Sequence, residues 1–159
     1  MMLLRLSYVS SVSMRGAASL PSSMEDILLA SVANNRRDDI SGFLVCDGFE
    51  FAQILEGPQA EVEACFGRIR GDDRNVEVRQ KDRKPETGRA FPRWSMCGLT
   101  LSAMDDALLT APELGYQFSR LSPGALEQRL ESLGLRYRER LDAEHQRLLD
   151  RARAGGPSQ

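Results

Sequence analysis

Two apolar runs, residues 40–46 and 49–56, are separated only by Asp47 and Gly48, and this feature constrains the fold more than any other part of the sequence. An Asp-Gly pair between apolar runs is the strongest short-range hairpin signal, and it predicts a two-residue type I′ turn. An antiparallel hairpin is therefore expected near the middle of the chain, and the elements before and after it must pair with it or pack against it.

The predicted turn also determines which residues of the hairpin face each other. It pairs Cys46 with Phe49 and, further along, Gly42 with Gln53. Glycine within a strand often marks close approach by a ligand or by another backbone. Gln53 carries a carboxamide in a row of apolar side chains, and an unpaired buried amide costs about 1–3 kcal/mol. Either Gly42 leaves room for a ligand beside Gln53, or it marks a bulge where Gln53 bonds to the main chain.

The predicted elements follow in the order strand, helix, strand, strand, helix, strand, strand. Alternation and apolar runs predict strands at residues 3–10, 40–46, 49–56, 76–80 and 91–99. The first helix is expected to open at a capping box in residues 22–25, and the second at Gly57-Pro58. Residues 11–21 and 81–89 are expected to be loops. This order predicts an α+β, ferredoxin-like split βαβ fold, with one sheet and both helices on one face.

Three polar side chains are expected to converge between the sheet and the helices. Tyr8 points to the apolar side of the first strand, Gln53 to that side of the third, and Asn35 lies near the end of the first helix. Each also has an ordinary structural role available, as a core tyrosine, a main-chain-bonded amide or a helix cap. In the last strand, Trp94 and Met96 are expected to share one face.

The sequence divides into a compact domain at residues 1–100, a helical extension at 101–153 and a flexible tail at 154–159. A capping box at residues 102–105 predicts a short helix, and residues 124–153 predict a long helix that Gly134 can interrupt. An apolar stripe follows the long helix at Leu126, Leu130, Leu133, Tyr137, Leu141 and Leu148. The stripe packs on the open face of the sheet or on a symmetry mate, or it is an output surface for a partner helix.

Composition excludes several kinds of site. The three cysteines, Cys46, Cys65 and Cys97, are scattered, which is neither a disulfide framework nor a metal-ligand spacing and favours a reducing, cytoplasmic location. The only histidine, His145, lies in a charged helical region and is expected to have a surface role rather than to act in catalysis. A net charge of −2, without early basic runs, argues against direct binding of nucleic acid, and no apolar run is long enough to cross a membrane.

Five stretches, in order and at consistent spacing, resemble the BLUF family of blue-light sensors that use flavin. They are residues 8–10, 34–42, 51–57, 68–75 and 89–96. The resemblance spans residues 3–99. One departure is Asn75, where some members of the family carry histidine.

The resemblance implies a flavin bound non-covalently between the two helices, with FAD favoured and FMN or riboflavin as alternatives. The cofactor-binding residues that it implies are Tyr8, Asn35, Gln53 and Arg74. Asn35 and Arg74 would bond the pyrimidine edge, and Gln53 would bridge the flavin and the Tyr8 hydroxyl. Next to the glutamine, the resemblance implies Ser10 and either Trp94 or Met96.

The implied function is a photoreceptor that turns over no substrate. Tyr8 gives up an electron and a proton to the excited flavin, and their return leaves Gln53 rotated, tautomerised or both. The signal would pass by contact to a separate partner protein, with the sensor as a homo-oligomer in the cytoplasm. Two alternatives stay open: a small flavin-dependent oxidoreductase, and a flavin-free split βαβ regulator or hydrolase. Against the oxidoreductase stands the lack of a Gly-rich phosphate loop.

Overall fold

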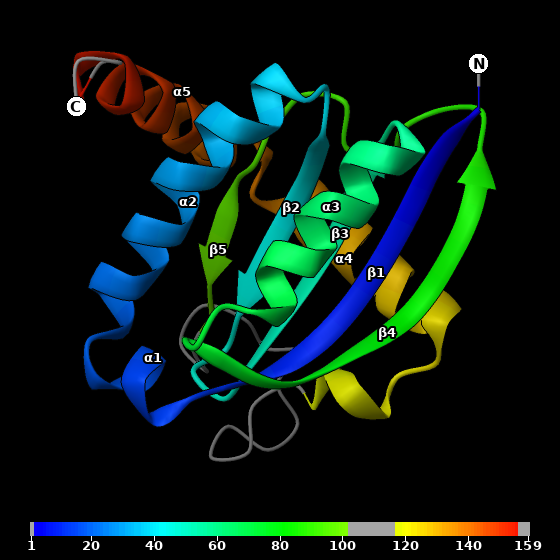
Figure 1. Cartoon of the computed structure of the whole chain (residues 1–159), viewed down its shortest axis with the longest axis horizontal. Coiled ribbons are helices and arrows are strands. Elements are labelled where there is room, and N and C mark those ends of the chain that lie inside the picture. The colour runs from blue at the N-terminus through cyan, green and yellow to red at the C-terminus, as the bar shows by residue number, and fades with distance from the viewer. Residues whose placement is uncertain (1, 102–116, 156–159) are drawn as a thin grey trace.

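The computed structural model describes residues 2–101 and 117–155, and this part of the chain contains one five-stranded sheet. The strands are β1 (Leu3–Val12), β2 (Ser41–Cys46), β3 (Glu50–Gly57), β4 (Asn75–Glu86) and β5 (Gly98–Thr100). They lie in the order β4-β1-β3-β2-β5; only the β2–β5 pair is parallel (Figure 1). The predicted α+β, ferredoxin-like split βαβ fold is confirmed.

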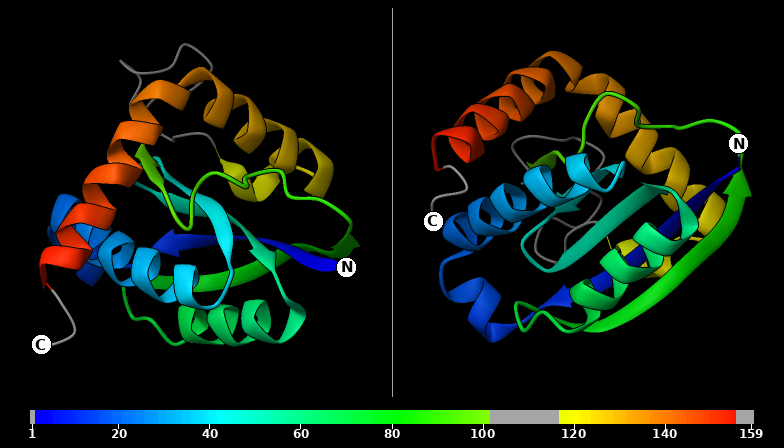
Figure 2. Two further views of the ribbon diagram at one scale, coloured as in Figure 1. Left: turned by 90° about the horizontal axis from the view of Figure 1, so that it is seen from above. Right: turned by 45° about the horizontal axis from the view of Figure 1, so that its top comes forward.

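Helices cover both faces of the sheet. They are α1 (Met14–Ala18), α2 (Leu20–Arg37), α3 (Gln59–Arg70), α4 (Pro123–Arg136) and α5 (Arg138–Gly155), with a 3₁₀ turn, η2, at Phe118–Arg120. As predicted, α2 and α3 lie on one face, while α4 crosses the other (Figures 1 and 2). Helix α5 runs beside α2, at the edge of the sheet.

Helical spacing explains the two apolar cores. On α2, the residues Met24, Leu28 and Val32 recur every fourth position and are buried against the sheet, together with Leu148 of α5. The second core, on the opposite face, includes most of the apolar stripe of the extension, namely Leu126, Leu130, Leu133 and Leu141. Of the arrangements open for the stripe, packing on the open face of the sheet is therefore the observed one.

The hairpin forms, but the expected register is wrong by two residues. The Asp47 carboxylate accepts hydrogen bonds from the amides of Phe49 and Glu50, both at 2.9 Å, which closes a longer loop. Cys46 consequently pairs with Phe51, and Leu44 rather than Gly42 faces Gln53. A slip of two residues leaves every side chain on its predicted face, because side chains in a strand alternate with a period of two.

Gly42 is explained by the main chain and not by a ligand. A Cβ atom on this residue would lie 2.1 Å from the carbonyl oxygen of Ile54 on the neighbouring strand. Neither alternative for Gly42 is therefore observed: it lies opposite Leu55 and not Gln53, and the β2–β3 pairing has no bulge at this residue.

The first helical segment begins earlier than predicted. Residues 11–21 contain α1 and the start of α2, which opens at Leu20 instead of at the capping box. Ser22 and Ser23 lie inside α2, and Ser23 N donates to the carbonyl of Ser19 at 2.9 Å, so the capping box does not open the helix.

Strand β4 is longer than predicted, because it is an edge strand with two bulges. Its pairing with β1 shifts register twice, and Glu77 has a φ of 53°, so the side chains do not alternate regularly. Charged residues and Pro85 occupy the part that the sequence predicts as a loop, and edge strands tolerate both.

Residues 91–97 do not form the predicted strand, since only Gly98–Thr100 forms β5. The carbonyls of Trp94 and Cys97 accept from Gly42 and Leu44 of β2, but no regular ladder forms. As a result Trp94 and Met96 lie on opposite sides of the sheet, contrary to the expectation of one shared face.

In the extension, the break between helices falls at Tyr137 and not at Gly134. The capping box at residues 102–105 lies outside the described residues. Within the described ranges, no helix is long and apolar enough to span a bilayer.

Candidate functional site

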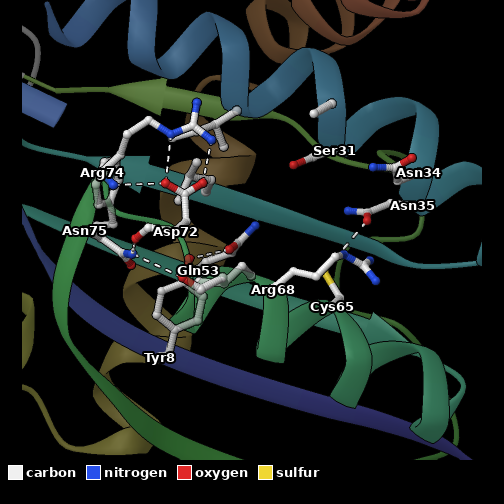
Figure 3. A pocket seen from close by; sticks show the side chains of 15 residues that line it. Tyr8, Ser31, Asn34, Asn35, Gln53, Cys65, Arg68, Asp72, Arg74 and Asn75 are labelled. Carbon is white, nitrogen blue, oxygen red and sulfur yellow. Dashed lines mark hydrogen bonds and ion pairs between the residues drawn. The ribbon is translucent and has the colours of Figure 1, made fainter. Parts of the chain in front are cut away.

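A cavity of about 190 Å³ lies between α2 and α3 and is closed below by β1, β2 and β3. Its apolar lining includes Ile27, Leu44, Phe51 and Ile69. Its polar lining includes all four predicted cofactor-binding residues, Tyr8, Asn35, Gln53 and Arg74 (Figure 3). The predicted convergence of Tyr8, Asn35 and Gln53 between sheet and helices is confirmed.

Gln53 links two partners at the floor of the cavity. Tyr8 and Gln53 are directly opposite on β1 and β3, and the Tyr8 hydroxyl donates to Gln53 Oε1 at 2.6 Å. Gln53 Nε2 donates to Met96 Sδ at 3.1 Å. A carboxamide has two donor hydrogens and two acceptor lone pairs, so one of each is left for a ligand. Gln53 is buried, with 4% of its surface exposed, which makes satisfying these positions energetically important.

Tyr8 is held as a neutral phenol. It is buried against Phe66, with ring centroids 5.5 Å apart, and burial raises the pKa of the hydroxyl well above its ordinary value. The hydroxyl proton therefore stays on the oxygen and is directed at Gln53.

Asn35 lies in the last turn of α2 and is buried. Its Nδ2 donates to the carbonyl oxygen of Ser95 at 3.1 Å, which directs Oδ1 away from that segment. The Cys65 thiol lies 3.9 Å from Oδ1, which is a weak contact. The carboxamide oxygen is thus suited to accept a hydrogen bond from a ligand N–H group.

Arg74 enters the cavity from the turn between α3 and β4. Its guanidinium forms a bidentate pair with Asp72, which lowers the pKa of that carboxyl and raises that of Arg74. The segment at the start of α1 holds the turn, because Ser13 N donates to the carbonyl of Arg74 at 3.0 Å and Ser13 Oγ to that of Asp73 at 2.7 Å. The arginine therefore offers its remaining N–H groups from a fixed position.

Of the residues expected around Gln53, only one contacts its amide. Met96 contacts the amide, whereas Trp94 faces the opposite core, where its ring centroid lies 5.5 Å from that of Phe43. Ser10 is fully buried on the cavity side of β1 but does not line the cavity, and its hydroxyl has no hydrogen-bond partner among the described residues.

Five polar residues that line the cavity were not predicted as site residues: Ser31, Asn34, Arg68, Asp72 and Asn75. Arg68 follows the buried Cys65 by three positions on α3, so helical periodicity places it on the same face and could have found it. Asp72 lies beyond the end of α3, in the turn before β4. The Asn75 amide donates to the carbonyls of Ile69 and Asp72, at 3.2 and 2.7 Å, and so fastens the turn.

His145 is not the surface residue that its sequence context predicts. It is half-buried on α5, and its Nε2 accepts a hydrogen bond from Ser95 N at 3.2 Å.

The fold and the cavity define a class of protein: a split βαβ binding domain for a flat aromatic ligand with a polar edge. Apolar side chains line part of the walls, while the carboxamides of Asn35 and Gln53 and the guanidinium of Arg74 supply donors and acceptors. An isoalloxazine ring has this chemistry, with apolar faces and carbonyl and N–H groups along its pyrimidine edge.

Comparison with known proteins identifies the family. Residues 3–97 match the family model BLUF, described as sensors of blue-light using FAD. The chain belongs to the BLUF family of flavin-based blue-light photoreceptors. Over 114 residues, which are 70% of the chain, it is 31% identical to photoactivated adenylate cyclase subunit beta of Euglena gracilis. The match spans only 13% of that relative's length, and 7% of a second Euglena gracilis relative.

Solved structures of the family have the same fold. BlrB, a BLUF protein in its dark state, superposes with a TM-score of 0.66 at 29% identity, covering 82% of this chain and 96% of BlrB. BlsA in its photo-activated state gives 0.72 at 26% identity, covering 82% of this chain and 94% of BlsA. The extension after residue 100 is therefore included in part in these superpositions.

Proposed function

We propose that this chain binds FAD in the cavity between α2 and α3 and converts blue light into a changed hydrogen-bond pattern at Gln53. The observation that carries the proposal is the continuous chain from the Tyr8 hydroxyl through the Gln53 carboxamide to Met96 Sδ. An amide is suited to such a switch because one end accepts and the other donates.

The residues that line the cavity fit the flavin ring. Asn35 Oδ1 would accept from a ring N–H, and Arg74 would donate to a ring carbonyl. The remaining N–H and lone pair of Gln53 would serve the polar edge next to Tyr8. FAD is preferred to FMN or riboflavin because the family is described by that cofactor.

A bound flavin supplies absorption of blue light and, once excited, a strong one-electron oxidant. Tyr8 would give up an electron together with its hydroxyl proton, and both would later return to it. Gln53 would be left rotated or tautomerised. After a rotation Nε2 would face the Tyr8 oxygen and Oε1 would face Met96, whose thioether has no hydrogen to donate. The contact with Met96 would be lost, so the change would pass to residues 91–97.

Output is proposed to be a contact with a separate effector protein, and no substrate is turned over by this chain. The relatives include a light-activated cyclase, in which sensing controls an enzyme. We further propose that the protein acts in the cytoplasm as a homo-oligomer, without direct contact with nucleic acid or membrane.

A single spectroscopic experiment tests the function. The protein is purified after expression with riboflavin supplied, and its spectrum is recorded before and after blue light. A yellow protein with a reversible red shift is expected, and heat-released cofactor should co-elute with FAD. Colourless protein, or a flavin spectrum that blue light leaves unchanged, would reject the proposal. Oxidation of a nicotinamide in the dark would favour the oxidoreductase alternative.

A further inference from the structure

Ser95 connects the cavity to α5 through its main chain. Its carbonyl oxygen accepts from Asn35 Nδ2 at 3.1 Å, and its amide donates to Nε2 of His145 at 3.2 Å. The hydroxyl lies 3.2 Å from the carbonyl of Val32 on α2 and 3.1 Å from the same histidine nitrogen. One peptide segment thus joins a cavity residue to the last helix.

The neighbours of Ser95 reinforce this link. Trp94 Nε1 donates to Asp142 Oδ1 at 2.9 Å, and the Cys97 thiol donates to the carbonyl of Leu141 at 3.3 Å. Met96, between them, instead contacts Gln53. Within residues 94–97, the Met96 side chain therefore contacts Gln53 of the cavity, and the other side chains contact α5.

We propose that His145 is a positioning residue of the photosensor, whose neutral imidazole holds Ser95 and thereby fixes Asn35 at the cavity and Met96 against Gln53. The inference rests on the proposed function and extends it to a residue outside the cavity. A change at Gln53 would shift the protonation equilibrium of His145, and protonation of His145 would shift the equilibrium between the Gln53 arrangements by the same factor, since coupling between equilibria is reciprocal. The rate at which Gln53 returns to its dark arrangement is expected to change as well, because the contact stabilises one arrangement over the other.

The hydrogen-bond roles require a specific protonation state. Nε2 accepts from the Ser95 amide only if the imidazole is neutral with its proton on Nδ1. Protonation turns Nε2 into a donor that points at another donor, so the Ser95 amide loses its acceptor. The contact should therefore fail in acid.

The surroundings oppose the charged form. Burial lowers the pKa of His145 most, Asp142 on the same helix raises it, and Arg36 of α2 lowers it. Arg93, from the segment packed against α5, is already paired with Asp142. Because the folded pKa lies below the unfolded value, stability from this contact is complete above a pH of about 6.5 and is lost as the pH falls through the folded pKa.

The first test needs no flavin. His145 is the only histidine, so its ring Cε1–H signal can be titrated by NMR in the cofactor-free chain without ambiguity. A pKa below about 6.5 is expected, together with smaller protection factors of the α5 amides below that pKa, that is, exchange rates compared with the intrinsic rates at the same pH. A pKa at or above the ordinary value, with protection factors independent of pH, would overturn the inference even if the protein has a normal photocycle.

The second test uses matched variants of the flavin-loaded chain. His145→Gln retains an acceptor near the Nε2 position but does not titrate, whereas His145→Leu removes the acceptor. His145→Leu should change the dark-recovery rate about fivefold, the effect of one net hydrogen bond. His145→Gln should recover at the unsubstituted rate near pH 7.5 but lose its pH dependence between pH 5 and 7.5. Gln146→Leu, at a neighbouring exposed position on α5, is the control and should behave as unsubstituted.

The outcomes separate the two ideas. If the unsubstituted protein shows no light-induced shift, the proposed function fails, and the titration of the cofactor-free chain still decides the His145 contact. If the shift occurs but all three variants recover at the unsubstituted rate with the same pH profile, His145 is not a positioning residue. Should His145→Leu fold poorly, the pH profiles of the unsubstituted chain and His145→Gln give the same decision.

Discussion

Met96 and Trp94 are two positions apart, yet they lie on opposite sides of the sheet. Met96 Sδ accepts from Gln53 Nε2 at 3.1 Å, whereas Trp94 Nε1 donates to Asp142 of α5 at 2.9 Å. A regular strand would place both on one face. Because residues 91–97 follow an irregular path, the methionine contacts Gln53 and the tryptophan contacts the extension.

This division predicts different effects for substitutions at the two positions. Met96→Leu conserves volume, so it should cost less than about 1.5 kcal/mol of stability, but it removes the sulfur acceptor and should alter the dark-recovery rate. Trp94→Phe should retain the light-induced red shift and increase hydrogen exchange in α5, because it loses the bond to Asp142. Absorption kinetics and exchange mass spectrometry measure both. The reverse pattern, with Trp94→Phe silencing the shift, would contradict this assignment.

The Tyr8–Gln53 pair predicts loss of the photochemical response without loss of the flavin. Tyr8→Phe and Gln53→Leu should each bind flavin and show no red shift after blue light. Tyr8→Phe should also destabilise the fold by about 1–3 kcal/mol, since the buried Oε1 of Gln53 loses its donor. Difference spectra and urea denaturation test this prediction. Tyr137→Phe, outside the cavity, is the control, and an unaltered shift in Tyr8→Phe would remove Tyr8 from the mechanism.

The correction at Gly42 leads to a stability prediction. Gly42→Ala should destabilise the protein by about 1–3 kcal/mol, because the new methyl group would overlap the carbonyl oxygen of Ile54. A methyl group on Gly67, within α3, would meet no described atom within 4 Å, so Gly67→Ala should stabilise by about 0.5–1 kcal/mol. Thermal melts of the cofactor-free chain compare the two. If Gly42→Ala is neutral for stability but expels flavin, the position borders the ligand after all.

The buried thiols predict inertness at neutral pH and a loss of stability in alkali. Burial raises the pKa of Cys46 and of Cys97 to about 12, and that of Cys65 also rises. The unfolded chain ionises its thiols near pH 8.5, so the stability that these groups contribute is complete below that value. It should decline as the pH rises toward about 12. Rapid labelling by a thiol reagent at pH 8 in the native state would contradict the burial of these groups.

The order of elements and the buried faces of the helices could be predicted from the sequence, because both follow from the periodic spacing of apolar residues. The spacing of Met24, Leu28 and Val32 and the alternation through Gln53 are local signals, and both survive a register error of two residues. The polar cluster of Tyr8, Asn35 and Gln53 followed from the same reasoning.

What could not be predicted depends on contacts distant in sequence. Strand β4 is defined by its pairing with β1, and residues 91–97 run beside β2 without forming a regular set of strand hydrogen bonds. Neither segment therefore shows the alternation of apolar and polar side chains of an ordinary strand. The contact between Ser95 and His145 joins residues 50 positions apart. No local pattern marks such a pair.

The Arg5 guanidinium has a consequence for how the protein unfolds. It bonds Glu56 of β3 at 2.8 Å, Glu127 of α4 at 2.6 Å and Glu86 of β4 at 3.3 Å. One partly buried cation on β1 therefore connects two other strands of the sheet to α4 of the extension. The apolar core that α4 forms with the sheet lies beside it. We expect sensor and extension to melt in a single cooperative transition. Trp94 fluorescence and release of the flavin would then report the same midpoint, and thermodynamically the extension would be part of the photosensory domain.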